Sequence, residues 1–84
     1  MPVLQVYSRQ GCHLCDILIE ELLPIVSGYM EVEVRDVDTR PDWLEKYDIR
    51  VPLVEYEGEP VCKYHLDRRA ISELLHSLSE APGE

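Results

Sequence analysis

A chain of 84 residues is long enough for one domain and too short for two, so we interpret residues 1–84 as a single domain. The hydrophobic fraction of 45% and the charged fraction of 30% are typical of a soluble protein, and no apolar stretch is long enough to cross a bilayer. A net charge of −9 repels phosphate backbones. We expect a monomer with no nucleic-acid partner and no membrane partner.

The N-terminal third of the sequence predicts a strand followed by a helix. The segment from Val3 to Tyr7 is typical of a short strand that enters the core, and residues 8–11 interrupt it, with Gly11 as the flexible point. A helix is expected from Cys12 onward, and Pro24 either ends or kinks it. The apolar residues that recur at helical spacing are Leu14, Ile17, Leu18, Leu22 and Ile25.

A second strand and a short helix are expected next. Residues 30–37 alternate between apolar and charged side chains, which predicts a strand with one face better buried than the other. Thr39 and Asp42 have the spacing of a capping box, which predicts a helix start at Thr39 and about two turns of helix. We interpret Trp43 as a core residue, because it shares helical spacing with two other apolar residues, Leu44 and Tyr47.

The C-terminal half predicts a hairpin and a last helix. Residues 52–57 and 60–64 are two short strands joined around Gly58, and Pro60 favours an edge position because it lacks an N–H. Asp67 is the candidate N-cap of the last helix, and residues 80–84 are expected to fray. The apolar face of this helix consists of Ala70, Ile71, Leu74, Leu75 and Leu78.

The order β-α-β-α-β-β-α predicts an α/β fold with one mixed four-stranded sheet. The first strand–helix–strand unit is expected to be a right-handed parallel crossover, and the hairpin must extend the same sheet in antiparallel fashion. We expect the strand order 2-1-3-4. The first and last helices should cover one face of the sheet and the short helix the other.

Cys12 and Cys15 are the candidate catalytic pair. The pair directly follows a predicted strand and opens a predicted helix, where free N–H groups and the helix dipole stabilise a thiolate at Cys12. Cys15 lies three residues on, so its sulfur can face that of Cys12 across one turn. Arg9 adds a positive charge nearby. This pattern favours thiol–disulfide exchange.

The cysteine count also bears on the cellular compartment. The chain has three cysteines, of which Cys62 is the third. This count is low and odd, whereas secreted disulfide-rich proteins usually have many cysteines in an even number. Residues 1–5 show no basic leader followed by an apolar block, so no secretory signal is expected. We therefore expect a cytoplasmic protein, in which closely spaced cysteines are more often catalytic or metal-binding.

Two segments carry a family resemblance. Residues 7–15 read Tyr-Ser-Arg-Gln-Gly-Cys-His-Leu-Cys, and residues 50–52 read Arg-Val-Pro. At this separation, they resemble the glutaredoxin branch of the thioredoxin superfamily, and more narrowly the small bacterial glutaredoxin-like proteins of undefined function. The resemblance covers nearly the whole chain and implies a thioredoxin fold.

The resemblance also implies roles for single residues. Cys12 corresponds to the nucleophile and Cys15 to the resolving thiol. Pro52 corresponds to a cis-proline beside the cysteines, which leaves the backbone of Val51 free to pair with an extended substrate. Arg9 falls where glutaredoxins usually have a lysine that meets a glutathione carboxylate. Protein or small-molecule disulfides are the expected partners.

The chain departs from glutaredoxins at two places. His13 and Leu14 replace the usual Pro-Tyr or Pro-Phe between the cysteines, and His13 either favours the thiolate or is simply exposed to solvent. Residues 64–67 read Tyr-His-Leu-Asp where glutaredoxins have a Gly-Gly turn and an acidic residue. Asp67 matches the acid that holds the glutathione amine, but the glycines are missing. We predict weak or no glutathione binding, although glutathione stays a candidate reductant, and no bound cofactor.

Two other functions stay open at this point. Cys12, Cys15, Cys62 and His65 have the residue types of a Cys₃His zinc site, although Cys62 is expected in an edge strand some way from the first helix. A protein-binding module with incidental cysteines is the second alternative. We interpret Cys62 as a partly buried strand residue, and His65 and His76 as surface residues.

Overall fold

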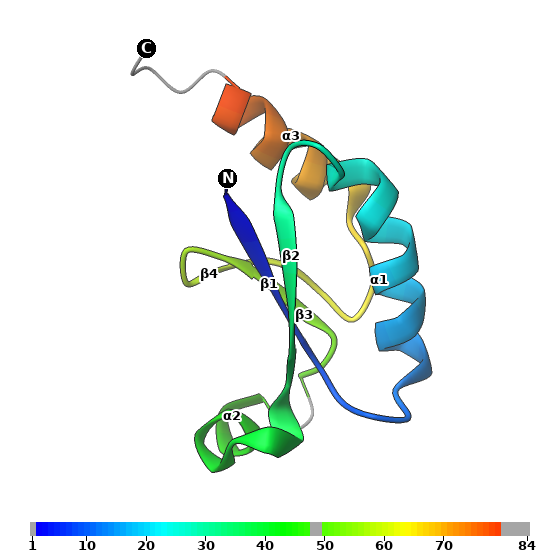
Figure 1. The fold of residues 1–84 in the computed structure, drawn as a ribbon, viewed down its shortest axis with the longest axis vertical. Coiled ribbons are helices and arrows are strands. Elements are labelled where there is room, and N and C mark those ends of the chain that lie inside the picture. Colours follow the sequence, from blue (N-terminus) through cyan, green and yellow to red (C-terminus); the bar gives the residue numbers. More distant parts are fainter. Residues whose placement is uncertain (1, 48–49, 80–84) are drawn as a thin grey trace.

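The computed structural model describes residues 2–47 and 50–79. The sheet has the strand order β2-β1-β3-β4, and the elements follow one another in the predicted order (Figure 1). In chain order the elements are β1 (Val3–Ser8), α1 (His13–Val26), β2 (Glu31–Asp36), the 3₁₀ turn η1 (Val37–Thr39), α2 (Pro41–Tyr47), β3 (Leu53–Tyr56), β4 (Glu59–Lys63) and α3 (Arg68–Ser79).

Strand β1 is central in the sheet. It pairs in parallel with β2 and antiparallel with β3, and β3 pairs antiparallel with β4, as predicted. The edge position expected for Pro60 is confirmed, because β4 is the last strand of the sheet. The hairpin turns through Gly58, whose φ of 84° is a conformation that glycine adopts without strain.

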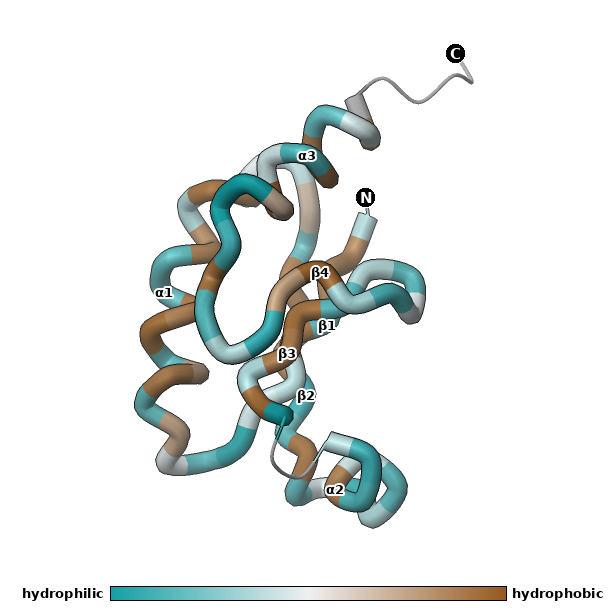
Figure 2. The backbone as a smooth tube through the Cα atoms, turned by 180° about the vertical axis from the view of Figure 1, so that it is seen from behind, coloured by the Kyte–Doolittle hydropathy of each residue, from teal (hydrophilic) through white to brown (hydrophobic). Residues whose placement is uncertain are grey.

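The main core lies on the face of the sheet that α1 and α3 cover, as the ribbon shows (Figure 1). Leu4 and Val6 point to this face, and hydrophobic residues are concentrated on β1, on β3 and at intervals along α1 (Figure 2). The buried members of this core are Leu4, Val6, Leu18, Leu22, Val26, Met30, Val54, Cys62 and Ile71.

A second, smaller core lies on the opposite face, near the carboxyl ends of β1 and β2. Side chains alternate along a strand, so Tyr7 points away from Val6 and contacts the group that includes Tyr47 and Leu53. The rings of Tyr7 and Tyr47 stack with centroids 4.1 Å apart. Trp43 packs against this cluster but is only partly buried, so its interpretation as a core residue is correct only in part.

Helix α1 buries a different stripe from the predicted one. Leu18 and Leu22 are buried as expected, and Cys15 and Val26 complete the stripe. Leu14 and Ile17 were expected on it, but their side chains are 44% and 39% exposed. They lie on the side of the helix that faces the turn between β4 and α3, where packing is incomplete. Pro24 does not end the helix, which continues to Val26.

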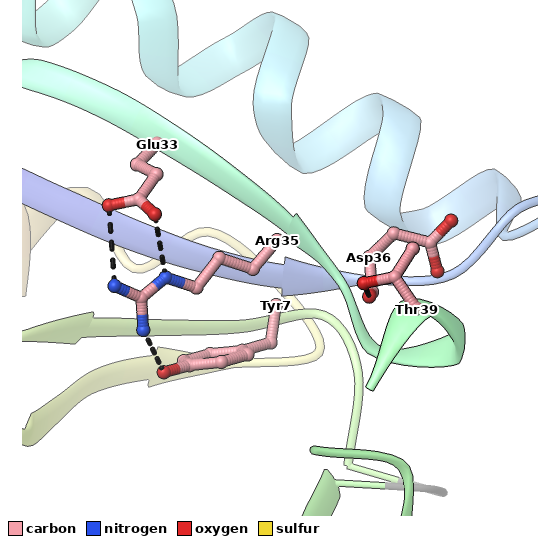
Figure 3. Close-up of polar contacts among 5 residues, drawn as sticks. All are labelled: Tyr7, Glu33, Arg35, Asp36 and Thr39. Carbon is pink, nitrogen blue, oxygen red and sulfur yellow. Dashed lines mark hydrogen bonds and ion pairs between the residues drawn. The ribbon is translucent and has the colours of Figure 1, made fainter. Parts of the chain in front are cut away.

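The capping box predicted at Thr39 and Asp42 is wrong. The Asp36 side chain caps the turn η1 by accepting the Asp38 N–H at 2.9 Å. The Thr39 hydroxyl donates to the Asp36 carbonyl at 2.7 Å, and Figure 3 shows Asp36 and Thr39 next to each other. Thr39 therefore closes the preceding turn. Helix α2 starts two residues later at Pro41, where a missing N–H costs nothing.

The start of α3 agrees with the sequence analysis. The Asp67 carboxylate accepts the Ala70 N–H at 3.1 Å, which confirms it as the N-cap. Ile71 is fully buried on the apolar face of the helix. The tail that was expected to fray, residues 80–84, lies outside the described residues. Within the described ranges, no helix is both long and apolar enough to span a bilayer.

Candidate functional site

Cys12 is the N-cap of α1. Its backbone is extended, with φ −87° and ψ 102°, and the Cys12 Sγ accepts the Cys15 N–H at 3.1 Å. The backbone N–H groups of the first helical turn have no carbonyl partner within the helix, so they favour negative charge at this sulfur. The sequence analysis expected Cys12 at the helix start for this reason, and the observed position is the cap itself.

A tight turn connects β1 to Cys12, the N-cap of α1. The Cys12 N–H donates to the Arg9 carbonyl at 3.2 Å, and Gly11 within the turn has φ 77°. Apart from Gly11 and its two chain neighbours, no described heavy atom lies within 4 Å of the position of a Cβ at Gly11, so a side chain would have space. The requirement for glycine here is conformational, because other residues are strained at this φ.

Cys12 and Cys15 form a disulfide, with Cα atoms 5.2 Å apart. This separation lies within the ordinary range for bridged cysteines. Cys12 is partly exposed, whereas Cys15 is only 1% exposed. Of the two cysteines, Cys12 is therefore the more accessible to a substrate. His13 follows Cys12 in the sequence and is exposed.

The Val51-Pro52 peptide bond is cis, as the resemblance implied. Pro52 is fully buried and precedes β3, and its carbonyl accepts the Tyr64 N–H at 2.7 Å. This hydrogen bond ties the proline loop to the turn that joins β4 to α3. Val51 packs against the second core.

Arg9 forms an ion pair with Asp38 that the sequence analysis did not predict. Its guanidinium contacts both carboxylate oxygens of Asp38, at 3.1 and 3.3 Å, and joins the loop after β1 to the turn η1. Asp38 is distant in sequence, and no local pattern marks the pair. An arginine held bidentately by a carboxylate is partly neutralised. This contact weakens the expectation that Arg9 meets a substrate carboxylate.

Asp67 is also occupied, as the N-cap of α3, although it is exposed. Before it, Tyr64 adopts φ 71°, a conformation in which glycine is far more common. The sequence signal for this turn was present, since residues 64 and 65 stand where glutaredoxins have two glycines. The turn keeps the glycine-like backbone but carries a tyrosine ring.

Cys62 is a buried free thiol of β4 and belongs to the main core. Burial raises its pKa, because the desolvated thiolate is disfavoured. In the part of the chain that the structure describes, no three His, Cys, Asp or Glu side chains gather closely enough to hold a metal ion. Cys12, Cys15, Cys62 and His65 are therefore not brought together, and the zinc hypothesis receives no support.

Comparisons with known proteins agree with this geometry. A family model for the glutaredoxin-like domain (DUF836) matches residues 3–76. Among solved structures, the chain is similar to the Northeast Structural Genomics target protein XcR50 from X. campestris, with 26% identity, a TM-score of 0.65 and coverage of 94% of this chain and 99% of that chain. No curated protein sequence matches the chain.

Two thioredoxins share the fold. A mutant thioredoxin from Halobacterium salinarum NRC-1 is 24% identical, with a TM-score of 0.64 over 96% of this chain and 77% of that chain. The germline-specific thioredoxin Deadhead from Drosophila melanogaster is 17% identical, with a TM-score of 0.53 over 90% of this chain and 79% of that chain. At these identities the likeness shows the fold alone.

Proposed function

Because the chain belongs to the glutaredoxin-like domain family (DUF836), we propose that it is a thiol–disulfide oxidoreductase that reduces protein or small-molecule disulfides. One observation supports this above all others. Cys12 is partly exposed at the start of α1 and its sulfur accepts the Cys15 N–H, while Cys15 is buried within the first turn. The two cysteines thus differ in access and in electrostatic environment, as an attacking and a resolving thiol must.

The reaction starts from the reduced protein. The Cys12 thiolate attacks one sulfur of the substrate disulfide, so that a mixed disulfide forms and one substrate thiolate leaves. The Cys15 thiol then loses its proton to solvent and attacks the Cys12 sulfur. This second step releases the other substrate thiolate and leaves the Cys12–Cys15 disulfide, the state that the structure describes. The substrate gains two electrons, and an external dithiol reductant restores the protein.

Substitution of each cysteine tests the proposal. The Cys12→Ser variant should lose reductase activity toward a peptide disulfide with dithiothreitol as the reductant. The Cys15→Ser variant, pre-reduced and freed of reductant, should attack once and then accumulate a mixed disulfide through Cys12, which mass spectrometry of the intact protein detects. Cys62→Ser is the matched control, because the third thiol is buried away from the pair, and it should retain nearly full turnover. Equal loss of activity in all three variants would contradict the assigned roles.

A further inference from the structure

A hollow of about 230 Å³ lies between the first half of α1 and the turn that joins β4 to α3. Leu14, Ile17 and Leu18 line it from the helix, and residues 64–66 line it from the turn. Leu14 lies in the first turn of α1, the turn that Cys12 caps and that contains Cys15, so the hollow reaches the same end of the helix as the disulfide. A substrate sulfur at Cys12 would thus bring its neighbouring residues close to this end of the hollow.

The walls expose apolar surface. The side chains of Leu14, Ile17 and Tyr64 are 44%, 39% and 38% exposed, although each is a large hydrophobic residue. The first two belong to the helix and the third to the turn, so the exposed apolar surface faces the hollow from both sides. Single exposed hydrophobic residues are common on protein surfaces, whereas three that line one hollow are typical of an interaction site.

The turn holds Tyr64 in an unfavourable backbone conformation. Tyr64 has φ 71°, and the His65 N–H donates across it to the Lys63 carbonyl at 2.8 Å, which closes a three-residue turn. The Tyr64 N–H donates in turn to the Pro52 carbonyl at 2.7 Å. Strained residues of this kind persist where the surrounding structure fixes them, and they are frequent at ligand-binding sites. Here the fixed element is one wall of the hollow.

Size limits what the hollow can hold. Pockets for drug-sized ligands measure about 300–1,000 Å³, whereas a dry apolar cavity of about 150 Å³ binds benzene. A volume of about 230 Å³ therefore suits one aliphatic or aromatic side chain better than a whole peptide. The net charge of −9 opposes an anionic partner, and Glu21, which also lines the hollow, forms an exposed ion pair with Arg68 at 3.8 Å.

We propose that this hollow binds an aliphatic or aromatic side chain next to the reacting cysteine of a neutral or basic polypeptide disulfide. The inference rests on the proposed exchange reaction and adds to it a substrate class and a specificity site. Glutathione disulfide is anionic and carries no apolar side chain beside its cysteine, so it is a poor substrate on both counts.

The test measures a single turnover of the pre-reduced protein, with no reductant present. Symmetrical disulfides of three N-acetylated and C-terminally amidated peptides, Lys-Leu-Cys-Gly, Lys-Ser-Cys-Gly and Glu-Leu-Cys-Gly, serve as probes. Samples are quenched in acid, alkylated and analysed by mass spectrometry for oxidised protein. The leucine peptide should react about tenfold faster than the serine peptide, which is the scale of discrimination by an apolar pocket. The lysine–leucine peptide should react faster than the glutamate–leucine peptide at low salt, and this difference in rate should decrease at high salt.

Variants link the preference to the hollow. Ile17→Ser should reduce the preference for leucine over serine to near unity, through a slower reaction of the leucine peptide. Leu23→Ser is the matched control, since Leu23 is 47% exposed on the same helix but does not line the hollow, and it should keep the preference. Tyr64→Gly removes the opposite wall at a position that suits glycine, and it should lower the preference as well.

The outcomes separate the two proposals. Equal rates for the leucine and serine peptides in the unmodified protein would overturn this inference and leave the exchange reaction standing. A preference that survives both Ile17→Ser and Tyr64→Gly, or a faster reaction with the glutamate peptide, would also overturn it. If the reduced protein oxidises with none of the peptides, the proposed exchange reaction itself fails, and this inference fails with it.

Discussion

The position of Cys12 at the start of α1 predicts a measurable difference between the two reactive thiols in the reduced protein. In the Cys15→Ser variant the N–H of residue 15 remains, so it can still donate to the Cys12 sulfur, as it does at 3.1 Å in the structure. A hydrogen bond to a charged group and the helix start together stabilise a thiolate by about 1–2 kcal/mol. An unperturbed cysteine is about 3% thiolate at pH 7, so this energy corresponds to about 15–50% thiolate at Cys12.

The assay is the ultraviolet absorbance of the thiolate, recorded against pH for the Cys15→Ser and Cys12→Ser variants. Cys62 adds no signal near neutral pH, because its burial raises the pKa of its thiol. Cys12→Ser leaves only Cys15 at the site, and its 1% exposure disfavours the charged form. The argument is refuted if Cys12→Ser shows the larger thiolate signal at pH 7. A signal of about 3% thiolate in Cys15→Ser would refute it equally.

Three further predictions concern ligand binding and stability. Isothermal calorimetry with glutathione should show no saturable binding, because the Gly-Gly turn is absent and both Arg9 and Asp67 already have partners; a low-micromolar isotherm would contradict this. Asp67→Ala should lower the free energy of unfolding in urea by about 1 kcal/mol through loss of the N-cap, whereas Asp67→Asn should retain most of it. Ile71→Ala should cost about 2–4 kcal/mol because the side chain is fully buried, against less than about 0.5 kcal/mol for the exposed control Leu23→Ala.

The sequence predicted the elements and their order because its local patterns and its global constraints agree. Alternation over residues 30–37 and the apolar spacing of the last helix each have one simple interpretation. The hairpin and the parallel crossover then leave few possible sheets, and the observed order β2-β1-β3-β4 is the predicted one. The pairing of Cys12 with Cys15 followed from the same logic, because a helix start after a strand is a local feature.

Features that depend on distant neighbours were not predictable. Leu14 and Ile17 fit an apolar helical stripe, but burial depends on what packs opposite, and the turn at residues 64–66 leaves space there. Thr39 has a capping residue type, yet its hydroxyl is already engaged with the Asp36 carbonyl. The pairing of Arg9 with Asp38 depends on how close the fold brings two loops, which no single-sequence pattern encodes.

Because Cys62 is buried, its reaction with an alkylating reagent reports unfolding of the protein. A thiol in the main core reacts with an alkylating reagent only when the surrounding strands and helices open. In the oxidised protein Cys12 and Cys15 are bridged, so one alkyl group per molecule reports opening around Cys62. In the reduced protein, where Cys15 is shielded as well, peptide mapping by mass spectrometry assigns each alkyl group to its cysteine, with no substitution. Stability in the oxidised and reduced states can thus be compared through a single native atom, the Cys62 Sγ.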